Sequence, residues 1–72
     1  MNNLNVAKIQ LNGDSYKIND GDSLEKLLFS LKIQRNKVAI EVNGKIIEQK
    51  GYKNLILNNN DKVEIVHFIG GG

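Results

Sequence analysis

The chain has 72 residues and a mass of 8.1 kDa, which leaves room for one domain with one small core. Its hydrophobic fraction of 40% and charged fraction of 25% are those of a globular protein and exclude compositional disorder. The absence of cysteine excludes a disulfide framework, a cysteine-ligated metal centre and a thiol nucleophile of the chain's own, and fits a reducing cytoplasm.

The distribution of charge argues against two classes of partner. The net charge of +2 comes from lysines scattered among acidic residues, whereas nucleic-acid-binding proteins concentrate basic side chains and stacking aromatics. Residues 1–5 lack the pattern of a signal peptide, and no apolar run approaches membrane-spanning length. We therefore expect a cytoplasmic protein that binds neither nucleic acid nor membrane and is a monomer when free.

The first predicted element is a β-hairpin. Residues 6–11 alternate between apolar and polar, with Ala7, Ile9 and Leu11 on one face, which is the period of a half-buried strand. Asn12-Gly13 supplies the two positive φ values of a type I′ turn. A two-residue turn puts the apolar residues of both strands on one face through three pairs: Leu11 with Asp14, Ile9 with Tyr16, and Ala7 with Ile18.

A short amphipathic helix is predicted next. Ser23 or Asp22 can cap its N-terminus, and Glu25, three residues after Asp22, stands as in a capping box. Such an apolar stripe is more often a core face than a partner-binding surface, so we expect it to pack on the sheet. Four leucines recur at helical spacing with polar residues between them: Leu24, Leu27, Leu28 and Leu31.

A second hairpin follows a polar connector. Val38, Ile40 and Val42 alternate with Ala39 and Glu41, as in a strand with one buried face. The dipeptide at 43–44 is again Asn-Gly, and the short returning strand at 46–47 sets its second isoleucine opposite Ile40. The sequence thus predicts two hairpins separated by one helix.

An irregular connection and a last strand complete the chain. Residues 58–61 are a turn by composition, and a final strand is expected over residues 62–68. Within the irregular segment 48–57, three side chains are expected to tuck under the sheet: Tyr52, Leu55 and Leu57.

The last strand points to a docking surface. Val63 and Ile65 are expected to face the helix, which leaves Val66 and Phe68 on the open side of the sheet. Exposed apolar residues are common in proteins, but these lead straight into the end of the chain. We predict that Val66, Phe68 and Ile69 form a patch to which a partner docks.

No catalytic or metal-binding residue is expected. His67, the single histidine, falls on the side of Val63 and Ile65, where a lone histidine more often caps the edge of a core than catalyses. The aspartates lie in turns, where they are common without a metal. These turn residues are Asp14, Asp20, Asp22 and Asp61.

The end of the chain carries the most specific signal. Gly70, Gly71 and Gly72 lack a Cβ atom, so they form a thread that can enter a narrow channel. Extended, residues 69–72 carry a terminal carboxylate about 13 Å beyond the domain. The glycines alone are equally compatible with a frayed end.

The predicted order of elements is that of the ubiquitin-like β-grasp, an α+β fold in which one main helix packs on one face of a mixed sheet of about five strands. Four further segments are the leucine-rich helix start at 23–28, VAIEVNG at 38–44, NDKVEI at 60–65 and VHFIGGG at 66–72. Together these segments, over nearly the whole chain, resemble the ThiS family, the sulfur carriers of thiamine biosynthesis. The resemblance implies one carrier domain over residues 1–72, with a flexible tail at 69–72.

The resemblance also implies a chemistry and its partners. By this resemblance, the residue that is essential in the family corresponds to Gly72. The glycine directly before it corresponds to Gly71, and the small residue before that to Gly70. An E1-like enzyme, ThiF, would use ATP to adenylate Gly72, and a sulfur donor such as a cysteine desulfurase would convert the adenylate to a thiocarboxylate. The thiazole synthase ThiG would then receive the sulfur. The chain would be a carrier, not an enzyme, and would bind no cofactor itself.

The sequence departs from the family at two places and leaves other functions open. Residues 60–62 are Asn-Asp-Lys where some relatives have Asp-Gly-Asp, and residues 1–5 extend beyond shorter relatives. The molybdopterin synthase small subunit and tRNA-thiolation carriers share the fold and the glycine end. A ubiquitin-like modifier would join Gly72 to lysines, and a simple binding module would not need residues 71–72.

Overall fold

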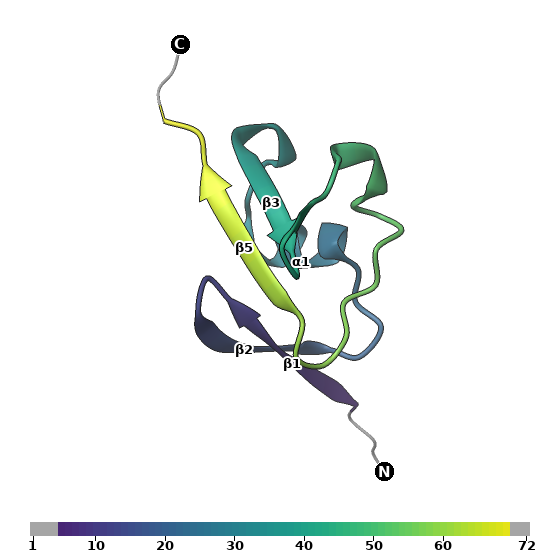
Figure 1. Cartoon of the computed structure of the whole chain (residues 1–72). Coiled ribbons are helices and arrows are strands. Elements are labelled where there is room, and N and C mark those ends of the chain that lie inside the picture. Colours follow the sequence, from purple (N-terminus) through teal and green to yellow (C-terminus); the bar gives the residue numbers. More distant parts are fainter. Residues whose placement is uncertain (1–4, 70–72) are drawn as a thin grey trace.

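The computed structural model describes residues 5–69, which form a five-stranded mixed sheet with one helix against one face (Figure 1). The strand order is β2-β1-β5-β3-β4, so the last strand is central. It pairs parallel to β1 and antiparallel to β3. The strands are β1 (Val6–Leu11), β2 (Asp14–Asn19), β3 (Val38–Val42), β4 (Lys45–Ile46) and β5 (Lys62–His67), and the helices are α1 (Leu24–Leu31) and the 3₁₀ turns η1 (Arg35–Lys37) and η2 (Gln49–Gly51).

Both hairpins form at the two Asn-Gly turns. Asn12 and Asn43 have φ values of 50° and 53°, and the glycine after each is also at positive φ. The pairing of β1 with β2 has the predicted register, with Ile9 opposite Tyr16. In the second hairpin the Ile47 amide donates to the Ile40 carbonyl at 2.9 Å, which confirms that register as well.

The helix begins one residue later than a capping box at Asp22 requires. Ser23 is the N-cap, and its hydroxyl oxygen accepts a hydrogen bond from the Lys26 amide at 3.1 Å. The predicted capping box of Asp22 with Glu25 is therefore wrong. The Asp22 carboxylate instead accepts from the Asn19 amide at 3.1 Å, and Glu25 forms an ion pair with Arg35.

The core lies between α1 and one face of the sheet, where the predicted apolar stripes meet. Leu55 is only half-buried, so the prediction that its side chain tucks under the sheet is only partly confirmed. Leu31 also lies at the margin of the core rather than within it. The helix, the irregular segment and β5 contribute these buried side chains: Leu24, Leu27, Leu28, Tyr52, Leu57, Val63 and Ile65. No helix within residues 5–69 is long and apolar enough to cross a membrane.

Asn12 ties the first hairpin to β5. β1 pairs with β5 only through Gln10 with Lys62 and Leu11 with Val63. At Asn12 the chain turns away, but its side chain continues the pairing. The amide oxygen accepts from the Ile65 amide at 2.8 Å, and the amide nitrogen donates to the Ile65 carbonyl at 3.3 Å. One side chain thus replaces the next backbone contact of the sheet.

We expect Asn12→Gly to lower the free energy of unfolding by about 1–2 kcal/mol more than Asn60→Gly does, because only Asn12 bonds Ile65. Glycine accepts the positive φ at both positions, which is 72° at Asn60. The side chain of Asn60 forms no hydrogen bond to another residue in the described part of the chain. Urea unfolding of the two variants measures the difference, and equal losses would contradict a bridging role for Asn12.

Candidate functional site

The end of β5 carries exposed apolar side chains toward the glycine tail. Val66 and Phe68 are 60% and 63% exposed on the sheet face away from α1, and Ile69, the next residue along, is 97% exposed. We call these three residues the apolar patch. Val66 lies opposite the half-buried Ala39 of β3, which extends the apolar surface sideways. The predicted tail residues Gly70, Gly71 and Gly72 lie outside the described residues.

Strand β3 holds the apolar patch in place from one side. His67 pairs with Val38, and the Phe68 amide donates to the Lys37 carbonyl at 2.9 Å. Pairing with β3 therefore continues to Phe68, two residues before the first glycine. β3 therefore holds the backbone of the patch as far as Phe68.

Sequence reasoning missed Ile46, which is 75% exposed on β4. It pairs with Glu41 and so lies on the same open face as Val66, two strands away. The register of the second hairpin contained this information, because a residue next to the inward-facing Ile47 must point outward.

An acidic pair separates Ile46 from the apolar patch. Glu41 and Glu64 lie directly opposite each other in the pairing of β3 with β5. Like charges at such a position destabilise a sheet. With Asn43, Gly44 and Lys62 they also line a shallow hollow at the other end of the open face. The open face thus has an apolar end at residues 66–69 and an acidic pair toward its other end.

His67 does not cap the core, contrary to the prediction. It is exposed, because the core on that face ends at Ile65 and Val38, and His67 lies beyond them at the end of the strand. Among residues 5–69, no group of three His, Asp or Glu side chains gathers closely enough to hold a metal ion.

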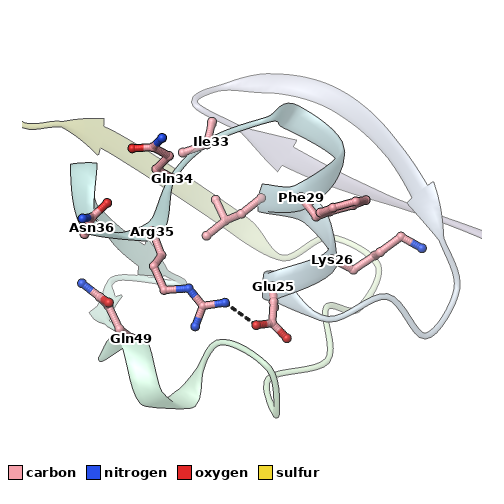
Figure 2. Close-up of a pocket in the computed structure, with 9 residues that line it drawn as sticks. Glu25, Lys26, Phe29, Ile33, Gln34, Arg35, Asn36 and Gln49 are labelled. Atoms are coloured by element: carbon pink, nitrogen blue, oxygen red, sulfur yellow. Dashed lines mark hydrogen bonds and ion pairs between the residues drawn. The ribbon is translucent and has the colours of Figure 1, made fainter.

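A second hollow, of about 800 Å³, lies on the helix side of the molecule (Figure 2). Arg35 reaches across it to form its ion pair with Glu25, and Phe29 of α1 stands beside it, 77% exposed. Burial raises the pKa of the nearby Tyr52 phenol, and the positive charge of Arg35 opposes this rise only in part. Tyr52 therefore stays protonated at neutral pH and does not act as a base there.

We expect Glu64→Gln to raise the free energy of unfolding by about 0.2–1 kcal/mol, because it removes the like-charge contact with Glu41. The gain should shrink in 1 M salt, where exposed charges are screened. Glu48→Gln is the control, since Glu48 has only an exposed contact with Lys50 at 3.5 Å. A loss of stability in Glu64→Gln would show that Glu64 has a favourable contact instead.

Comparison with known proteins gives matches along most of the chain. The model of the ThiS family matches residues 9–72. The sulfur carrier protein ThiS of Bacillus subtilis is 38% identical over 65 residues, which cover 89% of this chain and 98% of that protein. A thiazole synthase of Magnetococcus marinus is 42% identical over 65 residues, or 90% of this chain. The chain spans only 20% of the length of that thiazole synthase.

A solved structure matches the fold as well. The crystal structure of a thiamine biosynthesis protein, ThiS, from Geobacter metallireducens superimposes with a TM-score of 0.78 at 28% identity. The match covers 90% of this chain and 99% of that one. Together with the strand order and the single helix on one face, it confirms the predicted β-grasp.

Proposed function

This chain belongs to the ThiS family, and from that premise we propose that it is the sulfur carrier for thiazole formation in thiamine biosynthesis. The observation that carries the proposal is the family match over residues 9–72, which includes the three glycines. The similarity to the Bacillus subtilis carrier supports the thiamine pathway over the molybdopterin synthase small subunit. In this role the chain is a cargo carrier of the cytoplasm, and the catalysis belongs to its partners.

The proposed chemistry takes place at the Gly72 carboxylate. A carboxylate is a poor electrophile, so the E1-like enzyme ThiF first joins it to AMP from ATP and releases pyrophosphate. Sulfide attacks the acyl carbon and displaces AMP, which leaves a thiocarboxylate directly. A donor persulfide displaces AMP to give an acyl disulfide instead, and a second thiol of the donor or of the enzyme then attacks the donor sulfur, which releases the thiocarboxylate and leaves a disulfide on the protein side. The sulfur must come from outside the chain, because the chain contains no cysteine.

The proposed acceptor is the thiazole synthase ThiG. Support comes from the thiazole synthases of Magnetococcus marinus and Paramagnetospirillum magneticum, each of which contains a segment of about 65 residues similar to this chain. A carrier segment within the same polypeptide as its acceptor is held at high effective concentration. We infer that the separate chain makes the same delivery by docking.

The apolar patch is the proposed docking site for both enzymes. Val66 lies near the end of β5, and Phe68 and Ile69 follow the strand directly before the glycines, so a protein that covers these three residues also meets the start of the tail. Burial of such side chains contributes to affinity, and the acidic pair of Glu41 and Glu64 favours a partner surface with basic residues nearby.

We expect Gly71→Ala to slow both thiocarboxylate formation and sulfur transfer by about 10- to 100-fold, since a β-carbon widens the thread and restricts its backbone. Gly51→Ala is the matched control: its added carbon would meet only the Ile47 side chain at 3.8 Å, an ordinary contact. Mass spectrometry of the C-terminal peptide follows thiocarboxylate formation over time. Normal rates in Gly71→Ala would count against a narrow channel.

We expect Phe68→Ser to weaken binding to ThiF and to thiazole synthase by about tenfold or more, because an apolar anchor is lost. Phe29→Ser removes an even more exposed phenylalanine, on the helix side of the molecule, and should leave both affinities unchanged. Isothermal titration calorimetry measures the dissociation constant for each of the two enzymes. If the two variants bind alike, the apolar patch is not the docking site.

A further inference from the structure

The two edges of β5 are used unequally. On the β3 side, pairing runs without a break from Val63 to His67 and continues in the Phe68 amide. On the β1 side, backbone pairing covers only Lys62 and Val63. Beyond them, the Asn12 side chain forms hydrogen bonds with the backbone of Ile65. Figure 1 shows the consequence: the upper part of β5 lies beside β3, with no strand along its other edge.

The direction of each backbone group in this part of β5 follows from the antiparallel ladder. Phe68 donates to β3, and alternate residues of a strand face opposite edges, so His67 faces away from β3. Its N–H and C=O have no hydrogen-bond partner among residues 5–69. β1 cannot supply one, because the chain turns away at Asn12.

We propose that the free edge of β5 at His67 is a strand-addition site, where an extended segment of the enzyme that receives the tail pairs with the His67 N–H and C=O. This inference rests on the proposed carrier function. The occupant is main chain of that enzyme, because the exposed groups are one backbone donor and one backbone acceptor in strand geometry. The Asn12 side chain already occupies the edge at Ile65, so the added strand runs beside residues 67–69, toward the glycines.

Continuity with the apolar patch supports this occupant. Val66 and Phe68 flank His67 in the chain and project from the open face, so an enzyme that covers them also reaches the edge beside them. Main-chain pairing makes no demand on the enzyme's side chains. The same edge can therefore serve two enzymes of different sequence that must hold the same tail.

Pairing at this point also has an energetic role. Three glycines lose much conformational freedom when a channel orders them. β3 already holds the backbone as far as Phe68, and a strand added at His67 holds the same stretch from its other edge. The ordering of the tail then starts from a stretch that is paired on both edges.

Hydrogen exchange resolved to single amides tests the proposal directly. In the free protein, the His67 amide should exchange at least tenfold faster than those of Val66 and Phe68, which face β3. With saturating ThiF, and separately with thiazole synthase, the exchange rate of the His67 amide should fall by about tenfold or more. Exchange at a Val6 amide, at the far end of β1, should not change.

A pair of variants separates the amide from the side chain. His67→Pro removes an N–H that the sheet does not use and also fixes φ, whereas His67→Ala removes the imidazole but keeps the N–H. We expect His67→Ala to bind like the parent and His67→Pro to bind about 3- to 10-fold more weakly at a similar melting temperature. If His67→Pro fails to fold, the exchange measurement on the parent chain decides alone.

The outcomes distinguish this proposal from the proposed function. If the enzymes bind and Gly72 is thiolated while His67 exchange is unchanged, the strand-addition site is wrong and the carrier function stands. Protection of His67 in the free protein that disappears on dilution would assign the edge to a second copy of this chain and also overturn the proposal. If the enzymes do not bind and Gly72 is not thiolated, both the carrier function and the strand-addition site are wrong.

Discussion

The position of β5 is the constraint on which the rest of the structure depends. The strand that leads to the tail is central in the sheet, with Val63 and Ile65 buried against the helix. Burial of this face anchors the start of the strand, and the ladder with β3 keeps it straight to Phe68. The chain is therefore paired in the sheet as far as Phe68, which is what a carrier requires if the residues that follow are to be aimed at another protein's active site.

Most of the fold could be predicted because its signals are local. Alternation with a period of two gave the strands, and the Asn-Gly pairs at 12–13 and 43–44 set both hairpin registers. The capping box was wrong because Ser23 and Asp22 are adjacent and both able to cap, and the choice depends on a contact between Asp22 and the preceding turn. That choice is not visible in the residue pattern.

The features that sequence reasoning missed depend on contacts between distant segments. The bridge from Asn12 to Ile65 spans most of the chain, and nothing in a turn signal indicates that its side chain also completes a sheet. The exposure of His67 depends on where the core ends, and the open edge beside it on where β1 turns away. The exposure of Val66 and Phe68 followed from alternation alone, whereas their role as a docking site remains a prediction.

All of the proposed chemistry takes place at Gly72 and none in the folded domain, so the direct test is the chemical state of that residue. The measurement is the intact mass of the protein purified natively from thiamine-starved cells, with fragmentation to locate any change. We predict that sulfur replaces one oxygen of the Gly72 carboxylate. A plain carboxylate that persists even with ThiF, ATP and a sulfur donor present would contradict it, as would Gly72 joined to lysines of other proteins.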